Sequence, residues 1–153
     1  MKTTQVAAAL IWQGEKEMDV RCFTYQMLYT EVCRVAHALS SLHINKGDRV
    51  ALYMPMIPEL VIAMLACARI GAIHTAIFSG YAEGGVRSRI QGSKAKVVIT
   101  ADAAIRAGKI KPLKANLDPI LEKCPSVAHV VVVNHADLYD VKRPPTATSG
   151  GMT

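Results

Sequence analysis

Hydrophobic and polar residues follow two different periods along the chain, and each change of period marks a predicted element. Over residues 24–43, apolar side chains recur every three or four positions, which predicts one amphipathic helix. Residues 50–54 are apolar with little alternation, as expected for a strand buried on both faces. Similar short apolar stretches follow, separated by segments of helical period. This order predicts a mostly parallel sheet whose strands are joined by helices, an α/β fold.

The full prediction is a short N-terminal β-hairpin followed by successive βα units. The hairpin strands are expected at 8–12 and 21–23, the later strands at 73–78, 97–100 and 130–133, and the later helices at 58–70, 81–91 and 112–123. The helix at 81–91 is weaker, because Gly84 and Gly85 each cost about 1 kcal/mol relative to alanine. We expect residues 1–142 to be part of one domain, and 143–153 to be a linker or disordered tail.

Several local signals fix the expected helix ends. Thr24 can cap the first long helix with its side chain. Pro58 suits the first turn of the next helix, where a missing N–H has no cost. Gly71 is expected to end that helix in a left-handed conformation.

Composition narrows the range of functions. The 153 residues carry a formal net charge of +6, which suits an anionic partner, either nucleic acid or a phosphorylated small molecule. Aromatic residues make up only 5%, and no long run of lysine and arginine occurs, so a nucleic-acid module is not favoured. The four cysteines form no CxxC pair, which predicts reduced, mostly buried thiols of a cytosolic protein. The longest helical apolar run, 60–68, is too short to cross a membrane.

Candidate chemistry is expected beyond the carboxyl ends of the strands, where such folds bind ligands. The segment after Thr100 is the richest, because Arg106 and Lys109 flank the small pair Ala107-Gly108. Two cations around such a pair can close on a phosphate, with backbone N–H groups as further donors. The alternative is a solvated basic loop. Gly80 would let a ligand approach the backbone, or it simply forms a turn.

Residues 46–80, KGDRVALYMPMIPELVIAMLACARIGAIHTAIFSG, closely resemble the N-terminal region of acetyl-CoA synthetases, in the acyl-adenylate-forming ligase superfamily. The resemblance extends over about 9–134 and includes VVITADAAIRAGKIKPLK at 97–114. It implies an enzyme that converts acetate and ATP to acetyl-adenylate and then transfers the acetyl group to coenzyme A, with Mg²⁺ accompanying the ATP. It also implies that the loop Arg106-Ala107-Gly108-Lys109 contacts the phosphate-bearing nucleotide part of coenzyme A, with Gly80 near the same cofactor.

The sequence lacks the family's Ser/Thr/Gly-rich ATP phosphate loop, its adenine- and acyl-pocket motifs and its C-terminal lysine. We therefore expect a fragment of the larger N-terminal domain that carries no catalytic residue and is inactive alone. Its partners would be acetate, ATP and coenzyme A together with the rest of the enzyme, with no nucleic acid and no membrane. An exposed sheet edge would favour self-association. Two alternatives stay open, a stand-alone phosphate- or nucleotide-binding module without catalysis and a propionate-type acyl-CoA synthetase.

Overall fold

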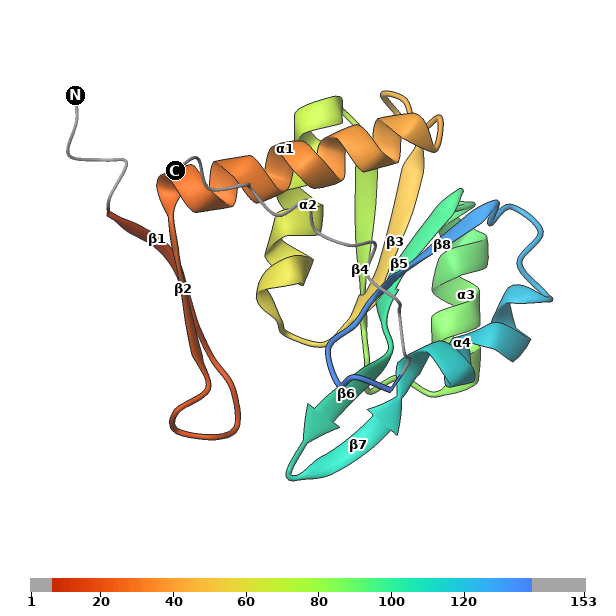
Figure 1. Cartoon of the computed structure of the whole chain (residues 1–153). Helices are drawn as coiled ribbons and strands as arrows, with labels where there is room; N and C mark the ends of the chain where they lie inside the picture. Colours follow the sequence, from red (N-terminus) through yellow and green to blue (C-terminus); the bar gives the residue numbers. More distant parts are fainter. Residues whose placement is uncertain (1–6, 139–153) are drawn as a thin grey trace, which may run out of the picture.

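The computed structural model describes residues 7–138, which fold around a four-stranded sheet (Figure 1). The tail predicted at 143–153 lies outside the described residues. In chain order, the elements are β1 (Ala8–Gln13), β2 (Val20–Thr24), α1 (Tyr25–Ser41), β3 (Arg49–Met54), α2 (Pro58–Ile70), β4 (Ile73–Phe78), α3 (Glu83–Ser93), β5 (Val97–Ala101), β6 (Ala103–Arg106), β7 (Lys109–Pro112), α4 (Leu113–Leu121) and β8 (His129–Val133).

The central sheet has the strand order β4-β3-β5-β8, and its neighbouring strands are all parallel. β3 and β5 are the inner strands, and Val50, Leu52 and Val97 on them are fully buried. Burial on both faces explains why these two strands have near-continuous apolar sequences. The outer strands are more exposed, with Ile73 on β4 56% and Val132 on β8 38% accessible. The predicted parallel α/β architecture is confirmed.

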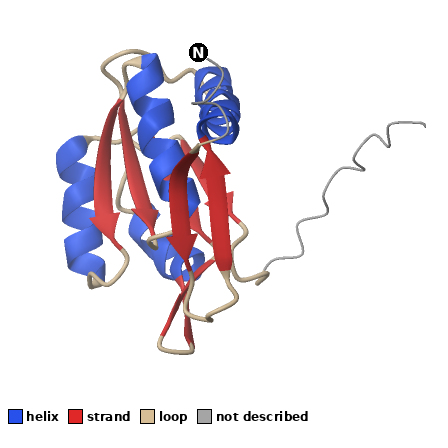
Figure 2. Cartoon of the chain, turned by 90° about the vertical axis from the view of Figure 1, so that its left-hand side faces the viewer, coloured by secondary structure: helices blue, strands red, loops and turns tan. Residues whose placement is uncertain are grey.

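Helices cover both faces of this sheet, as right-handed crossovers require. The chain passes from β3 to β4 through α2, and then returns past β3 to β5 through α3 in the opposite direction. Right-handed connections therefore put α2 and α3 on opposite faces. α1 packs on α2, and α4 packs on α3, which completes the two layers. Figure 2 shows helices on both sides of the strands.

The expected helix ends are present. The side chain of Thr24 accepts a hydrogen bond of 3.2 Å from the backbone N–H of Met27 and so caps α1. Pro58 lies in the first turn of α2, and Gly71 ends that helix with a left-handed φ of 74°. α3 begins at Glu83, two residues later than expected. Within residues 7–138, no helix is both long enough and apolar enough to span a membrane.

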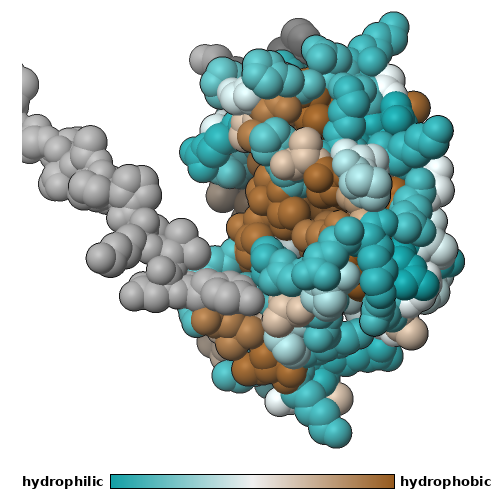
Figure 3. Space-filling model, turned by 90° about the vertical axis from the view of Figure 1, so that its right-hand side faces the viewer, coloured by the Kyte–Doolittle hydropathy of each residue, from teal (hydrophilic) through white to brown (hydrophobic). Residues whose placement is uncertain are grey.

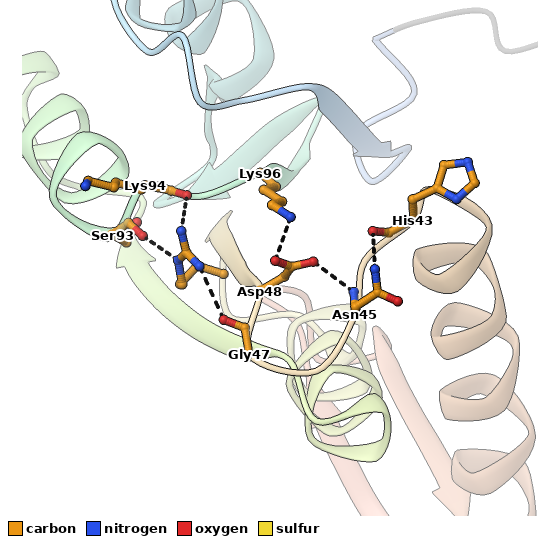
Figure 4. A network of polar contacts seen from close by, with 8 residues as sticks. His43, Asn45, Gly47, Asp48, Ser93, Lys94 and Lys96 are labelled. Carbon is orange, nitrogen blue, oxygen red and sulfur yellow. Dashed lines mark hydrogen bonds and ion pairs between the residues drawn. The ribbon is translucent and has the colours of Figure 1, made fainter.

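A polar network fixes the amino-terminal edge of the sheet (Figure 4). The carboxylate of Asp48 accepts a 2.9 Å hydrogen bond from the backbone N–H of Asn45 and pairs with Lys96 at 2.7 Å. The hydrogen bond with the Lys96 ammonium lowers the pKa of Asp48. Arg49 donates to the carbonyl of Ser93 at 3.0 Å, where its charge complements the negative end of α3. These contacts join the loops before β3 and β5, so this edge is structural.

The segment 103–112 differs from the sequence-based expectation. We expected a loop without strands, but β6 and β7 form an antiparallel hairpin shortly after β5. Each strand has only four residues, and most of them are exposed. Such short, polar strands do not produce the alternating pattern from which strands are recognised in a sequence. The other antiparallel pair, β1 with β2, is the N-terminal hairpin that the sequence predicts.

Candidate functional site

The β6–β7 hairpin begins at the carboxyl edge of the sheet, where the single residue Asp102 separates β6 from the end of β5 at Ala101 (Figure 1). In open α/β sheets, ligands bind outside the carboxyl ends of the strands. The hairpin therefore lies where the fold class places a binding site, with the predicted residues Arg106–Lys109 at its tip.

Arg106 and Lys109 are paired residues on neighbouring strands, joined by the two-residue turn Ala107-Gly108. Both turn residues have left-handed backbones, with φ of 50° for Ala107 and 69° for Gly108. This is the signature of a type I′ hairpin turn. Directly opposed residues project from the same face of a hairpin, so the two cations stand side by side. Both are exposed, and among residues 7–138 neither forms an ion pair.

The backbone amides of this turn bind an anionic group of the protein itself. The N–H groups of Ala107 and Gly108 donate to the two carboxylate oxygens of Glu15, with 2.9 Å between the Gly108 nitrogen and Oε2. Glu15 lies in the loop between β1 and β2. This contact could not be predicted from the sequence, because 92 residues separate Glu15 from Ala107. The geometry shows that the two amides can hold both oxygens of one anion.

Gly80 lies in the loop after β4, and this loop is tied to the base of the hairpin. The ammonium of Lys111 on β7 donates to the carbonyl of Ser79 at 2.7 Å. A Cβ on Gly80 would lie 2.3 Å from a ring carbon of Phe78, so close packing against that ring favours glycine here. Among the hydrogen bonds of residues 7–138, none joins Gly80 directly to the turn at Ala107.

A cavity of about 340 Å³ opens beside the base of the hairpin, between α3 and α4. Two tyrosine rings, Tyr53 and Tyr81, line it together with the cation of Lys111 and the amide of Asn116. The guanidinium of Arg89 lies 4.0 Å from the centre of the Tyr81 ring, which holds that ring in place. The volume is at the lower end of the range for small-molecule pockets.

Asp102 is a fully buried carboxylate between β5 and β6. It accepts hydrogen bonds from the backbone N–H groups of Ala103 at 2.7 Å, His135 at 2.8 Å, Leu138 at 3.0 Å and Ala136. Burial acts to raise the pKa of Asp102, but the four donors outweigh it and hold the pKa below its usual value. Asp102 therefore fixes the start of the hairpin against the segment after β8. The sequence alone offered no partner for it.

The model of the AMP-binding enzyme family matches residues 1–149. The chain belongs to this family. An acetyl-coenzyme A synthetase of Gemmatimonas aurantiaca is 56% identical over 126 residues, which cover 82% of this chain and 19% of that protein. The acetyl-coenzyme A synthetase 2 of Pseudomonas putida is 49% identical over 82% of this chain and 19% of its own length. The acetyl-coenzyme A synthetase of Methanothrix thermoacetophila is 50% identical over 85% of this chain and 20% of its own length. The chain thus spans about a fifth of the length of these curated relatives.

The resemblance to acetyl-CoA synthetases seen in the sequence is confirmed by these relatives. In this member of the AMP-binding enzyme family, the hairpin turn carries two cations and two backbone amides that can contact an anionic group. Across residues 7–138, no three or more His, Cys, Asp or Glu side chains gather into a group that could hold a metal ion.

Proposed function

We propose that this chain is part of an AMP-forming acetate–CoA ligase and contributes to the binding of coenzyme A. The β6–β7 turn carries this proposal, because Arg106 and Lys109 stand on one face of the hairpin with two amide donors between them. A guanidinium can make two parallel hydrogen bonds to a phosphate, and an ammonium adds a mobile point charge. Gly80 and Ser79, held through Lys111, extend the site along the sheet edge.

The complete ligase would work in two steps. Acetate attacks the α-phosphorus of ATP, which gives acetyl-adenylate and releases pyrophosphate. The thiol of coenzyme A then attacks the acyl carbon, and AMP leaves. Mg²⁺ would accompany the ATP, and we assign no residue of 7–138 to that ion, since no suitable group of side chains is present there. The residues described here would hold and orient the nucleotide end of coenzyme A and carry none of the bond-making steps.

The relatives named acetyl-CoA synthetases favour this function over a stand-alone nucleotide-binding module or a propionate-type ligase.

The cysteines support a reducing, cytosolic location. All four are free thiols, two of them buried, and burial raises the pKa of Cys67 to about 11. A thiol with such a pKa stays protonated and unreactive at neutral pH.

Titration of the 153-residue chain with coenzyme A and with 3′-dephospho-coenzyme A tests the proposal. We expect coenzyme A to bind about tenfold more tightly, because charge-assisted hydrogen bonds to the 3′-phosphate are each worth about 1.5–3 kcal/mol before screening by water. Arg106→Ala should reduce the difference between the two ligands, since Lys109 and the two amides remain. Arg34→Ala removes the same charge from the exposed surface of α1 and should preserve it. Equal affinities in the unmodified chain would contradict the proposal.

A further inference from the structure

Glu15 holds the same backbone amides that a phosphate would meet at the tip of the β6–β7 hairpin. Its two carboxylate oxygens accept from the N–H groups of Ala107 and Gly108. A carboxylate and a phosphate both present pairs of anionic oxygens, so one can replace the other on these donors. The cations Arg106 and Lys109 border the same turn.

The loop that carries Glu15 is ordered by its own hydrogen bonds. The N–H of Gly14 donates to the carbonyl of Asp19 at 2.7 Å, and the N–H of Asp19 donates to the carbonyl of Lys16 at 2.9 Å. The side-chain amide of Gln13 also donates to the carbonyl of Lys16, at 2.9 Å. These bonds close the loop around its base, so the carboxylate of Glu15 is presented to the turn by a defined backbone.

The β1–β2 hairpin, which carries that loop, is anchored to the body of the molecule. The indole N–H of Trp12 on β1 donates to the carbonyl of Met56 at 2.7 Å. Arg21 on β2 forms a 2.7 Å ion pair with Glu59 at the start of α2. These two contacts hold the β1–β2 hairpin on the body of the molecule, so Glu15 reaches the turn from an anchored support.

We propose that the amides of Ala107 and Gly108 form an anion site that Glu15 fills in the free protein and that a phosphate monoester fills in its place. The inference deepens the proposed function, on which the identity of coenzyme A as the ligand rests. A phosphate monoester carries about −1.5 to −2 charges at neutral pH, more than a carboxylate, and so competes well for the site beside two cations. Because the ligand must displace Glu15, the free protein binds it more weakly than a chain without this carboxylate would.

The test uses Glu15→Gln, which keeps the size of the side chain and removes its charge. Glu17→Gln is the matched control, since Glu17 lies in the same loop and its side chain makes no ion pair or hydrogen bond among residues 7–138. Both variants and the unmodified chain are titrated with coenzyme A and with inorganic phosphate. The backbone amide signals of Ala107 and Gly108 are followed by NMR, together with their hydrogen-exchange rates before any ligand is added.

We expect the Ala107 and Gly108 amides to exchange faster in Glu15→Gln alone. Both coenzyme A and phosphate should bind this variant about three- to tenfold more tightly than they bind the unmodified chain, and Glu17→Gln should bind them no more than about twofold more tightly. Equal gains in both variants would show a general charge effect and overturn the inference. Weaker binding by Glu15→Gln would make Glu15 a supporting residue and also overturn it.

These titrations can contradict the coenzyme A proposal and the Glu15 anion-site proposal independently of each other. If phosphate shifts the two amide signals as expected but coenzyme A does not bind, the anion site stands and coenzyme A is the wrong ligand. If coenzyme A binds with the expected dependence on its 3′-phosphate but Glu15→Gln behaves like Glu17→Gln, the proposed function stands and the anion site falls. If neither ligand moves the amide signals of Ala107 and Gly108 in Glu15→Gln, the anion site is overturned.

Discussion

Asp102 uses nearly every polar atom that it has. Its carboxylate accepts from four backbone N–H groups, its own N–H donates to Val133 at 2.9 Å, and its carbonyl accepts from Leu113 at 3.0 Å. One residue thereby joins the end of β8, the start of β6 and the start of α4. A buried carboxylate is costly to desolvate, so its retention here depends on these donors. The position of the hairpin that carries Arg106–Lys109 depends on Asp102 in turn.

We predict that Asp102→Asn lowers the free energy of unfolding by about 3 kcal/mol, measured by urea denaturation. The amide keeps one acceptor oxygen and turns an NH₂ group toward backbone donors, so charged hydrogen bonds worth about 1.5–3 kcal/mol each are lost. Asp118→Asn is the control. Asp118 is exposed and pairs with Lys114 on the surface of α4, so it should cost no more than about 0.5 kcal/mol. Equal effects of the two changes would contradict this role for Asp102.

The lowered pKa of Asp102 gives the same prediction a dependence on pH. A carboxyl whose pKa is lower in the folded than in the unfolded state stabilises the fold above its unfolded pKa. That contribution is lost as the pH falls from about 4 through the folded pKa. The destabilisation caused by Asp102→Asn should therefore shrink as the pH falls below about 4. A constant difference between the two chains from pH 7 to pH 3 would show that the carboxylate charge does not matter.

Elements with a strong hydrophobic period were predictable from the sequence. The helix expected at 24–43 is α1, Tyr25–Ser41, and the strand expected at 97–100 is β5, Val97–Ala101. The helix buries one apolar stripe, and the strand is buried on both faces. This burial stabilises each element and also requires the apolar residues from which it is recognised in the sequence. β6 and β7 have little to bury, and their hairpin is set by the left-handed turn at Ala107 and by Asp102. No hydrophobic period can signal such an element.

The same contrast applies to the candidate site. Arg106 and Lys109 could be nominated from the sequence, because two cations around a small pair are local and suit a phosphate. Glu15 could not, since only the fold brings the β1–β2 loop to a turn more than 90 residues away. The contact of Lys111 with Ser79 likewise depends on the order of strands in the sheet. Charge and residue type are readable locally, but long-range pairing is not.

Replacing a glycine by alanine should change the stability of the chain in opposite directions in helix α3 and in the β6–β7 turn. Gly84 lies in α3 with no atom within 4 Å of an added Cβ and with no positive φ, so Gly84→Ala should stabilise the chain by about 0.4–1 kcal/mol. Gly108 has a φ of 69°, where alanine costs about 1–2 kcal/mol, so Gly108→Ala should destabilise it. Thermal unfolding of both variants measures the two signs. Destabilisation by Gly84→Ala would mean that α3 needs its glycine for another reason.

At the scale of the whole molecule, the sheet of the described residues, 7–138, has β4 and β8 as its two edges. β4 and β8 each pair with one strand within residues 7–138. Figure 3 shows hydrophobic surface gathered on the side of the molecule where β8 lies in Figure 1. The partly buried Val130 and Val131 and the exposed Val132 belong to this strand. An unpaired apolar strand is a template for pairing with another chain.

We therefore predict that the 153-residue chain self-associates through β8, with a second copy as the partner. Val132→Lys should weaken this association by about tenfold, because each copy would bring a desolvated cation to the contact. Met18→Lys adds the same charge at a 93% exposed position in the β1–β2 loop, away from the sheet edge, and should leave association unchanged. Sedimentation velocity over a range of concentrations measures the effect. A chain that stays monomeric at every concentration, or equal weakening by both lysines, would place any association outside β8.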